Sequence, residues 1–452
     1  MSDSLSRALV AGALACAAAP GLAQTTSGPG PPEATRAAAT VASAAPAEPP
    51  SGWHWDFSGS PSLRHGDAFR ADFRTRAHWD AWWLDPVPED ASDDHEWSMV
   101  RFGVEGHLFK VVEYEVTYDF IDDESPWKDV YLNVRARSDL QAMGGHFKVP
   151  FGRERLQGIT SLDFVNRTLV SRDLAPGRDW GGMVHGRTAR RGLSYAIGYF
   201  AGEPEGAIGQ IDAPEIDGPV QPSLEATRPM WAGRAVVRPF ALAGRDGWVE
   251  DLEIGGDVMT AELPEGLFGA RGRSLYGPVF FDRVYTKGRR LGFGVDAGLT
   301  TGPFSVQAEY AQVNDDRENQ GIGDETLPDL VSYGWWVSGT WVVTGQKKSN
   351  ADSPKRWFPM KGIGAIEVAM RVERLRFKSA STAGEEPYRN PRAANLYPNS
   401  DTVWTTGVTW YSSRWVKVQY NAIRETIEDI ERTLLPGEDT FWSNVVRIQL
   451  LF

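Results

Sequence analysis

One short stretch of the sequence, FRADFRTRAHW at residues 69–79, places three arginines among aromatic and small residues. Successive side chains of a β-strand point to opposite faces, so Arg70, Arg74 and Arg76 share one face. Guanidinium groups keep their charge, and side chains two residues apart on a strand stand about 7 Å apart. A small oxyanion can then leave one arginine while it reaches the next. The row predicts an anion path, provided that its face lines a water-filled channel.

Further basic residues recur on the polar faces of other alternating segments. Together with the first row they form the candidate anion-binding set Arg70, Arg74, Arg76, Arg101, Arg135, Arg137, Lys148, Arg153, Arg155, Arg234 and Arg238. Each of them has an ordinary alternative, because an arginine on a channel wall also solvates that wall or pairs with a neighbouring carboxylate. Carboxylates do occur on the same faces, namely Asp72, Glu105, Glu309, Glu367 and Glu373. Arg238 stands near a turn that it can simply hold.

Other chemistries lack the residues that they need. Cys16 is the only cysteine, which excludes a disulfide within the chain and a cysteine-cluster metal site. The three aspartates within 119–123 do not have the spacing of an EF-hand and are better explained as a solvated loop. His146 and His185 are isolated, and neither a Gly-x-Ser-x-Gly motif nor a phosphate loop is present. We therefore expect no cofactor, no metal and no enzyme activity, with an outer-membrane enzyme kept as the alternative that esterase and phospholipase assays test.

The elements that position these residues are strands. Period-two alternation recurs from Trp53 onward, and helical periodicity is scarce. About sixteen segments alternate, near residues 68–80, 97–109, 112–121, 128–137, 139–149, 181–188, 192–201, 229–239, 252–263, 289–300, 303–313, 332–344, 362–376, 402–411, 414–423 and 441–452. Their connections alternate between short and long, except that residues 345–361 are long where a short turn is expected. The pattern predicts a closed antiparallel barrel with long loops at one end.

A membrane barrel explains three features better than a soluble all-β protein with one wet face. Aromatic residues repeatedly stand on the apolar face near strand ends, where interfacial girdles lie. Each alternating run has about ten residues, the length of a tilted membrane crossing. The chain ends on Phe452 in an alternating segment, which is typical of the signal that barrel-assembly machinery recognises. A secreted, tryptophan-rich carbohydrate-binding protein is the soluble alternative, and it predicts a product that needs no detergent.

Composition and the N-terminal region place the chain outside the cytoplasm. The 452 residues include 47 basic and 60 acidic ones, a formal net charge of −13, which argues against nucleic acid as a partner. Residues 1–23 resemble a secretory signal peptide, and residues 24–52 are a Pro- and Ala-rich linker that is expected to be disordered. Residues 53–452 then form the barrel. A lipoprotein that begins at Cys16 is an alternative with a weaker cleavage pattern.

Several stretches resemble the phosphate-selective porin O/P family. The most specific is the "FKVPFGRE" segment within residues 144–187; the stretches 61–74, 302–310 and 364–375 resemble it less specifically. The resemblance implies a homotrimer of sixteen-stranded barrels with loops folded into the lumen, whose arginines and lysines bind phosphate-like anions. Lys148 stands in the family's motif just before the inward loop, Arg153 and Arg155 follow it, and the arginines of residues 69–79 match the family's basic first strand.

The sequence departs from that family in its charge. The segments 89–96, 121–126, 314–320 and 425–431 are acidic, and a vestibule of that sign repels phosphate at long range. We therefore expect an outer-membrane porin that passes small anions such as phosphate, or, as the alternative, a porin without phosphate selectivity. The expected partners are outer-membrane lipid, lipopolysaccharide, small anions, two further copies of the chain and the barrel-assembly machinery. The expected location is the outer membrane of a Gram-negative bacterium, with the linker in the periplasm.

Overall fold

The structure is a computed structural model of the chain. It describes residues 52–452 apart from 88–92, 189–191, 203–210, 213–228, 246, 269–270, 277–278, 360, 382–385, 430 and 432–437. The expected signal peptide (1–23) and nearly all of the linker (24–52) lie outside the described residues.

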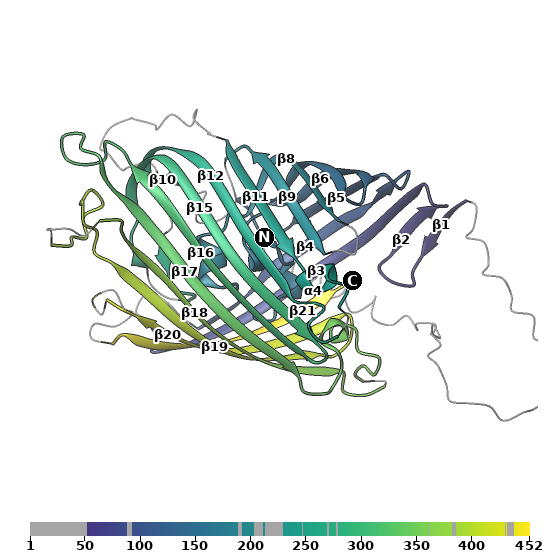
Figure 1. The fold of residues 1–452 in the computed structure, drawn as a ribbon. Coiled ribbons are helices and arrows are strands. Elements are labelled where there is room, and N and C mark those ends of the chain that lie inside the picture. The colour runs from purple at the N-terminus through teal and green to yellow at the C-terminus, as the bar shows by residue number, and fades with distance from the viewer. Residues whose placement is uncertain are drawn as a thin grey trace, which may run out of the picture.

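Sixteen long strands of the described part of the chain form one closed antiparallel barrel (Figure 1). They are β3 (Phe69–Asp85), β4 (Asp94–Leu108), β5 (Val112–Asp119), β6 (Trp127–Arg137), β7 (Leu140–Lys148), β8 (Arg178–Arg187), β9 (Leu193–Phe200), β11 (Met230–Val237), β12 (Glu253–Phe268), β15 (Val284–Thr301), β16 (Phe304–Arg317), β17 (Leu327–Val342), β18 (Ala365–Ser379), β19 (Asn399–Tyr411), β20 (Val416–Ile427) and β21 (Thr440–Leu451). Each pairs with the next, and β21 pairs with β3, from Leu451–Arg76 to Trp442–Asp85. The predicted fold and strand number are confirmed.

Alternation separates two environments across the barrel wall. Val337 and Met370 point outward and are exposed, together with many other large apolar side chains on the outer face. Glu309, Arg371 and Thr405 point inward and are almost fully buried. An apolar exterior around a polar interior is the arrangement of a barrel in lipid. The exposed apolar side chains of the outer face then contact acyl chains and not water.

Several strands continue past the expected segments. The loop predicted at 83–96 is shorter than expected, because β3 runs to Asp85 and β4 begins at Asp94. β15 has 18 residues, well beyond a membrane crossing of about ten. Polar and apolar residues alternate only where the outer face of a strand is apolar. The hydrogen bonds between strands continue beyond that region, so the alternation does not show where a strand ends.

The two ends of the barrel differ in their connections. Tight turns join β4 to β5, β6 to β7, β15 to β16 and β19 to β20 at one end, the short-turn end. Residues 343–364 join β17 to β18 at this same end, so the connection that departs from the expected pattern is an extended turn, and the strand count holds. This turn contains η4 (Lys348–Asn350), and the connection from β11 to β12 contains α4 (Pro239–Leu242).

A small hairpin extends the sheet at the short-turn end. β1 (Trp53–Asp56) pairs with β2 (Ser62–His65), and β2 pairs with the first residues of β3 (Figure 1). β21 ends at Leu451, and the backbone of the next residue, Phe452, exchanges two hydrogen bonds with Thr75. The hairpin therefore covers the part of the β3 edge that β21 leaves free, where an open strand edge would invite pairing with another chain.

Shorter elements lie in the long loops at the other end. The β7–β8 connection, residues 149–177, contains α2 (Arg153–Leu156), η1 (Ile159–Ser161) and α3 (Leu169–Asp173). The β12–β15 connection contains a small hairpin of β13 (Gly272–Arg273) and β14 (Val279–Phe281), and β10 (Ile211–Asp212) pairs with the end of β12. No helix in the described residues is long and apolar enough to cross a membrane.

Candidate functional site: the lumen and its inward loop

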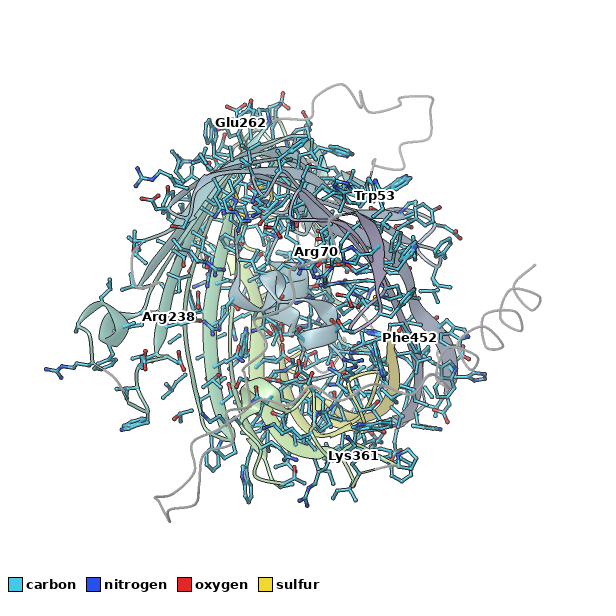
Figure 2. The ribbon with its side chains drawn as sticks, turned by 90° about the vertical axis from the view of Figure 1, so that its right-hand side faces the viewer. Trp53, Arg70, Arg238, Glu262, Lys361 and Phe452 are labelled. Atoms are coloured by element: carbon cyan, nitrogen blue, oxygen red, sulfur yellow. The ribbon has the colours of Figure 1, made fainter. Side chains whose placement is uncertain are left out.

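The inward loop, residues 149–177, folds into the barrel as predicted. Val149, Phe151, Leu169 and Leu174 have no exposed surface, because they pack on one another and on side chains of the wall. Figure 2 views the barrel down its axis from the short-turn end and shows the short helices inside the ring of strands. The loop and the wall bury this apolar surface away from water, and the hydrophobic effect therefore holds the loop against the wall.

Hydrogen bonds fix the beginning of the inward loop. Lys148, at the end of β7, donates to the carbonyl oxygens of Leu156 and Gln157 at 3.2 and 2.6 Å. Glu309 of β16 accepts from the backbone N–H groups of Arg153 and Glu154, both at 3.1 Å. These N–H groups belong to the first turn of α2 and have no partner inside the helix, so the Glu309 carboxylate satisfies them.

Buried charges join the middle of the loop to β18. Arg371 donates to Glu154 of α2 at 3.3 Å and lies 3.1 Å from Glu373 on its own strand. Glu373 also accepts from the backbone N–H of Leu169 at the start of α3. Arg371 is among the largest fully buried side chains of the described residues. Charges this deep stabilise a structure only while they stay paired, so this contact fixes the position of the loop.

The lower part of the loop is held from the short-turn end. Lys348, in the extended turn, reaches into the lumen and contacts Asp163 of the loop, at 2.5 Å, and Glu367 of β18. Burial alone lowers the pKa of Lys348, but the two carboxylates outweigh it, so the pKa lies above its ordinary value and the ammonium stays charged. Lys417 of β20 donates to the carbonyl oxygens of Thr160 and Leu162.

The last strand and a second inward segment complete the packing. Arg447 of β21 forms a two-pronged ion pair with Asp80 of β3, at 2.7 and 2.6 Å, and donates to the carbonyl oxygen of Val165 in the loop. The β13–β14 hairpin also lies inward, where Asn166 donates to Tyr276. The inward loop therefore contacts the wall from β12 to β21. We call this side the packed arc.

The wall formed by β3–β6 stays open toward the lumen, and we call it the open arc. A small hollow lies against it, lined by Arg74, Arg76, Arg101, Gly103, Val104, Glu105, Glu115 and Thr117. Arg76 and Arg101 stand directly opposite each other on β3 and β4. The pairing of β3 with β4 therefore brings Arg74, Arg76 and Arg101 together at one hollow.

Most of the candidate cations have carboxylate partners. Eight of the eleven pair as follows: Arg70 with Asp72, Arg74 with Glu105, Arg101 with Asp119, Arg135 with Glu113, Arg137 with Asp139, Arg153 with Glu253 and Asp296, Arg234 with Asp257 and Asp296, and Arg238 with Glu253. Arg137 and Arg238 lie beside turns of the short-turn end. Arg153, on the inward loop, and Arg234, on β11, bind carboxylates of the packed arc. Lys148 binds carbonyl oxygens, and Arg155 lies half-buried on α2.

Arg76 differs from the paired cations. No carboxylate of the described residues lies within 4.0 Å of its guanidinium group, and it makes no hydrogen bond to them. Its neighbours in the hollow, Arg74 and Arg101, are bonded to Glu105 and Asp119. An unpaired guanidinium beside two others attracts an anion more strongly than a paired one does.

The candidate set omits the charges that hold the loop. Arg371 and Arg447 alternate inward on their strands, so the sequence signal for a lumen position exists, but it does not reveal their partners. Lys348 carries no such signal, because its turn departs from the expected pattern. Contacts between residues 185 positions apart, such as Lys348 with Asp163, depend on the closure of the barrel.

Comparison with known proteins gives a family and a fold. The family model for phosphate-selective porin O and P matches residues 69–201 and 282–452. A search of curated proteins finds no match.

Solved structures share the barrel at low identity. In-vitro folded OmpT, an outer membrane protein of Vibrio cholerae, has a TM-score of 0.53 at 11% identity, covering 85% of this chain and 98% of that one. Its trimer form has a TM-score of 0.51 at 10% identity, covering 85% and 100%. The outer membrane channel DcaP of Acinetobacter baumannii has a TM-score of 0.51 at 9% identity, covering 85% and 98%. The family match extends over most of the barrel strands, and the chain belongs to the phosphate-selective porin O and P family of outer-membrane channels.

Proposed function

We propose that this porin passes small oxyanions such as phosphate along the open arc, with Arg76 as the principal point of attraction. The observation that supports this proposal is the hollow in which unpaired Arg76 stands beside Arg74 and Arg101. Arg101 binds Asp119 through Nε, which leaves its terminal nitrogens for a passing anion. An anion bound there can exchange among three guanidinium groups, and such multi-site binding favours conduction over trapping.

The second candidate is a porin with no preference for phosphate. The observation in its favour is the pairing within the open arc, where Arg70, Arg74, Arg101 and Arg135 all have carboxylate partners. Each pair is nearly neutral at a distance, which leaves a weak field in the lumen. Under the first proposal we accordingly expect only modest anion selectivity for the wild type.

Planar-bilayer conductance separates the two functions. Reversal potentials in a potassium chloride gradient give the ion preference, and added phosphate tests for block of the chloride current. We expect a modest anion preference and a partial block by phosphate. In Arg76→Gln, which keeps hydrogen-bonding capacity and removes one charge, both should weaken.

The matched control is Arg245→Gln, which removes one charge from an exposed turn of the short-turn end. If wild type and Arg76→Gln show the same ion preference and the same phosphate block, the anion proposal is wrong, and the porin without phosphate preference replaces it.

We further propose the assembly and location that accompany this function. Residues 1–23 direct export, residues 24–52 lie in the periplasm, and the barrel-assembly machinery inserts the chain through its Phe452 end. Three copies form a homotrimer in a membrane of phospholipid and lipopolysaccharide; OmpT of Vibrio cholerae, which shares the fold, has a trimer form. We propose that the protein is a channel and not an enzyme, since the charged side chains of the lumen that are described above hold the inward loop or face the channel.

A further inference from the structure

The extended turn, residues 343–364, concentrates positive charge at the short-turn end. It contains five basic residues and a single acidic one, Asp352. Lys348 points into the lumen and pairs there. The other four, Lys347, Lys355, Arg356 and Lys361, are exposed, and none of them forms an ion pair with the described residues. Unpaired cations gathered on one surface can attract an anionic partner.

The same turn packs on the outer, lipid-facing side of the barrel. Trp410 points outward from β19, and its indole Nε1–H donates to the carbonyl oxygen of Ile363 at 2.6 Å. The ring of Phe358 meets that of Trp410 edge to face, with 5.5 Å between centroids. Phe358 and Ile363 are themselves 48% and 60% exposed. These apolar side chains therefore extend the aromatic rim of the barrel rather than its mouth.

Backbone contacts hold the turn in this position. Phe358 N–H donates to Ser412, and Gly364 N–H donates to Arg356, both at 2.9 Å. Gly364 has φ of 83°, and a Cβ there would lie 2.1 Å from the carbonyl oxygen of Tyr411. Only glycine allows this close approach to β19. Figure 2 shows Lys361 at the outer edge of the ring of strands, whereas Arg70 lies inside it.

Exposed aromatic and aliphatic side chains beside a cluster of cations match the interface of a lipid leaflet. The apolar groups enter the boundary between headgroups and acyl chains, and the cations meet the phosphates. The short turns of outer-membrane barrels face the periplasm, so the leaflet here is the inner one, which consists of phospholipid. We propose that five side chains of this turn form a binding site for anionic phospholipid, in which Lys355, Arg356 and Lys361 contact the headgroup and Phe358 and Ile363 contact the acyl chains.

Native mass spectrometry of the detergent-solubilised full chain tests the site. Wild type is incubated with phosphatidylglycerol or with phosphatidylcholine, and the bound lipid is counted. We expect an excess of bound phosphatidylglycerol over phosphatidylcholine. In the triple variant Lys355→Gln, Arg356→Gln, Lys361→Gln, we expect about tenfold weaker binding of phosphatidylglycerol, with phosphatidylcholine unchanged.

The control variant, Lys110→Gln, Arg187→Gln, Arg245→Gln, removes three positive charges from other parts of the short-turn end and should keep the excess. Heat-dependent gel mobility verifies that both variants form the barrel. A wild type without preference for phosphatidylglycerol, a test variant that keeps it, or a control that loses it equally would each overturn the proposal. The proposal would also be overturned if the wild type retained peptidoglycan and not lipid, and if the test variant lost this retention.

Discussion

The packed arc and the open arc use similar side chains under different conditions. In the packed arc, Arg371, Glu373 and Glu154 are buried between wall and loop, and nearly all contacts are internal. In the open arc, Arg74 and Glu105 pair at 2.5 Å, yet their side chains are 41% and 29% exposed. The residue types are the same in the two arcs, and the exposure of their side chains to solvent is what differs.

That difference decides what each arc can do. Removing one partner of a buried ion pair leaves an uncompensated charge and costs about 3–5 kcal/mol. An exposed pair contributes about 0–1 kcal/mol, since water competes for both groups. The packed arc is therefore suited to fixing the shape of the channel. The open arc can exchange its partners with a solute at little cost.

The largest expected effect concerns the seam where the two arcs meet. Phe452 directly follows β21 of the packed arc, bonds to Thr75 of β3 in the open arc, and stacks on Trp415 at 6.0 Å. Deleting Phe452 should lower the amount of barrel in the outer membrane severalfold, because the chain would lose the assembly signal that we propose for this residue. The barrel refolded in detergent should lose about 1.5–4.5 kcal/mol, the contribution of one aromatic pair and the two backbone hydrogen bonds to Thr75. Immunoblots of membrane fractions and heat-dependent gel mobility measure the two quantities; normal membrane levels would contradict the assembly role.

Arg371→Met tests the packed arc directly. The change leaves Glu154 and Glu373 buried without their cation, and we expect a loss of about 3–5 kcal/mol. The temperature at which gel mobility shifts should fall clearly. Arg135→Gln is the matched variant in the open arc, where the pair with Glu113 is exposed, and it should change stability by about 0–1 kcal/mol. Equal shifts in the two variants would remove the distinction between the arcs.

Lys348→Met releases the lower part of the inward loop from the extended turn. Asp163 and Glu367 lose the ammonium group between them, so the loop end is freed while the ties through Arg371 and Arg447 remain. We expect a larger and noisier single-channel conductance with a smaller loss of stability than in Arg371→Met. A conductance trace identical to wild type would show that Lys348 is not needed to position the loop.

The triple variant Arg70→Gln, Arg74→Gln, Arg76→Gln removes three charges from the open arc while leaving the packed arc intact. Reversal potentials should shift toward cations, and phosphate should block chloride current less. Screening sets the size of the effect, because the Debye length is about 10 Å at 0.1 M salt and about 3 Å at 1 M. The shift should therefore shrink at high salt. An unchanged ion preference at low salt would mean that the row only solvates the wall.

Alternation in the sequence predicts most of the fold. A strand that separates lipid from water must alternate, so sixteen segments and their inward faces follow from local sequence. Strand ends follow less well, as β15 shows, since hydrogen bonding continues beyond the apolar band. The inward position of the loop after Lys148 follows from a family resemblance and not from local physics.

The sequence by itself determines which side chains face the lumen, including all three arginines of residues 69–79, because a period of two leaves no other choice. Only the tertiary structure decides which of them keep a free charge. Asp72 pairs with Arg70 two residues away on the same strand, whereas Glu105 and Asp119 become partners of arginines only in the register of adjacent strands. Arg76 lies beyond 4.0 Å from every described carboxylate. The pairs with Glu105 and Asp119 depend on distances between side chains of neighbouring strands, and these distances are set only when β3, β4 and β5 pair in register.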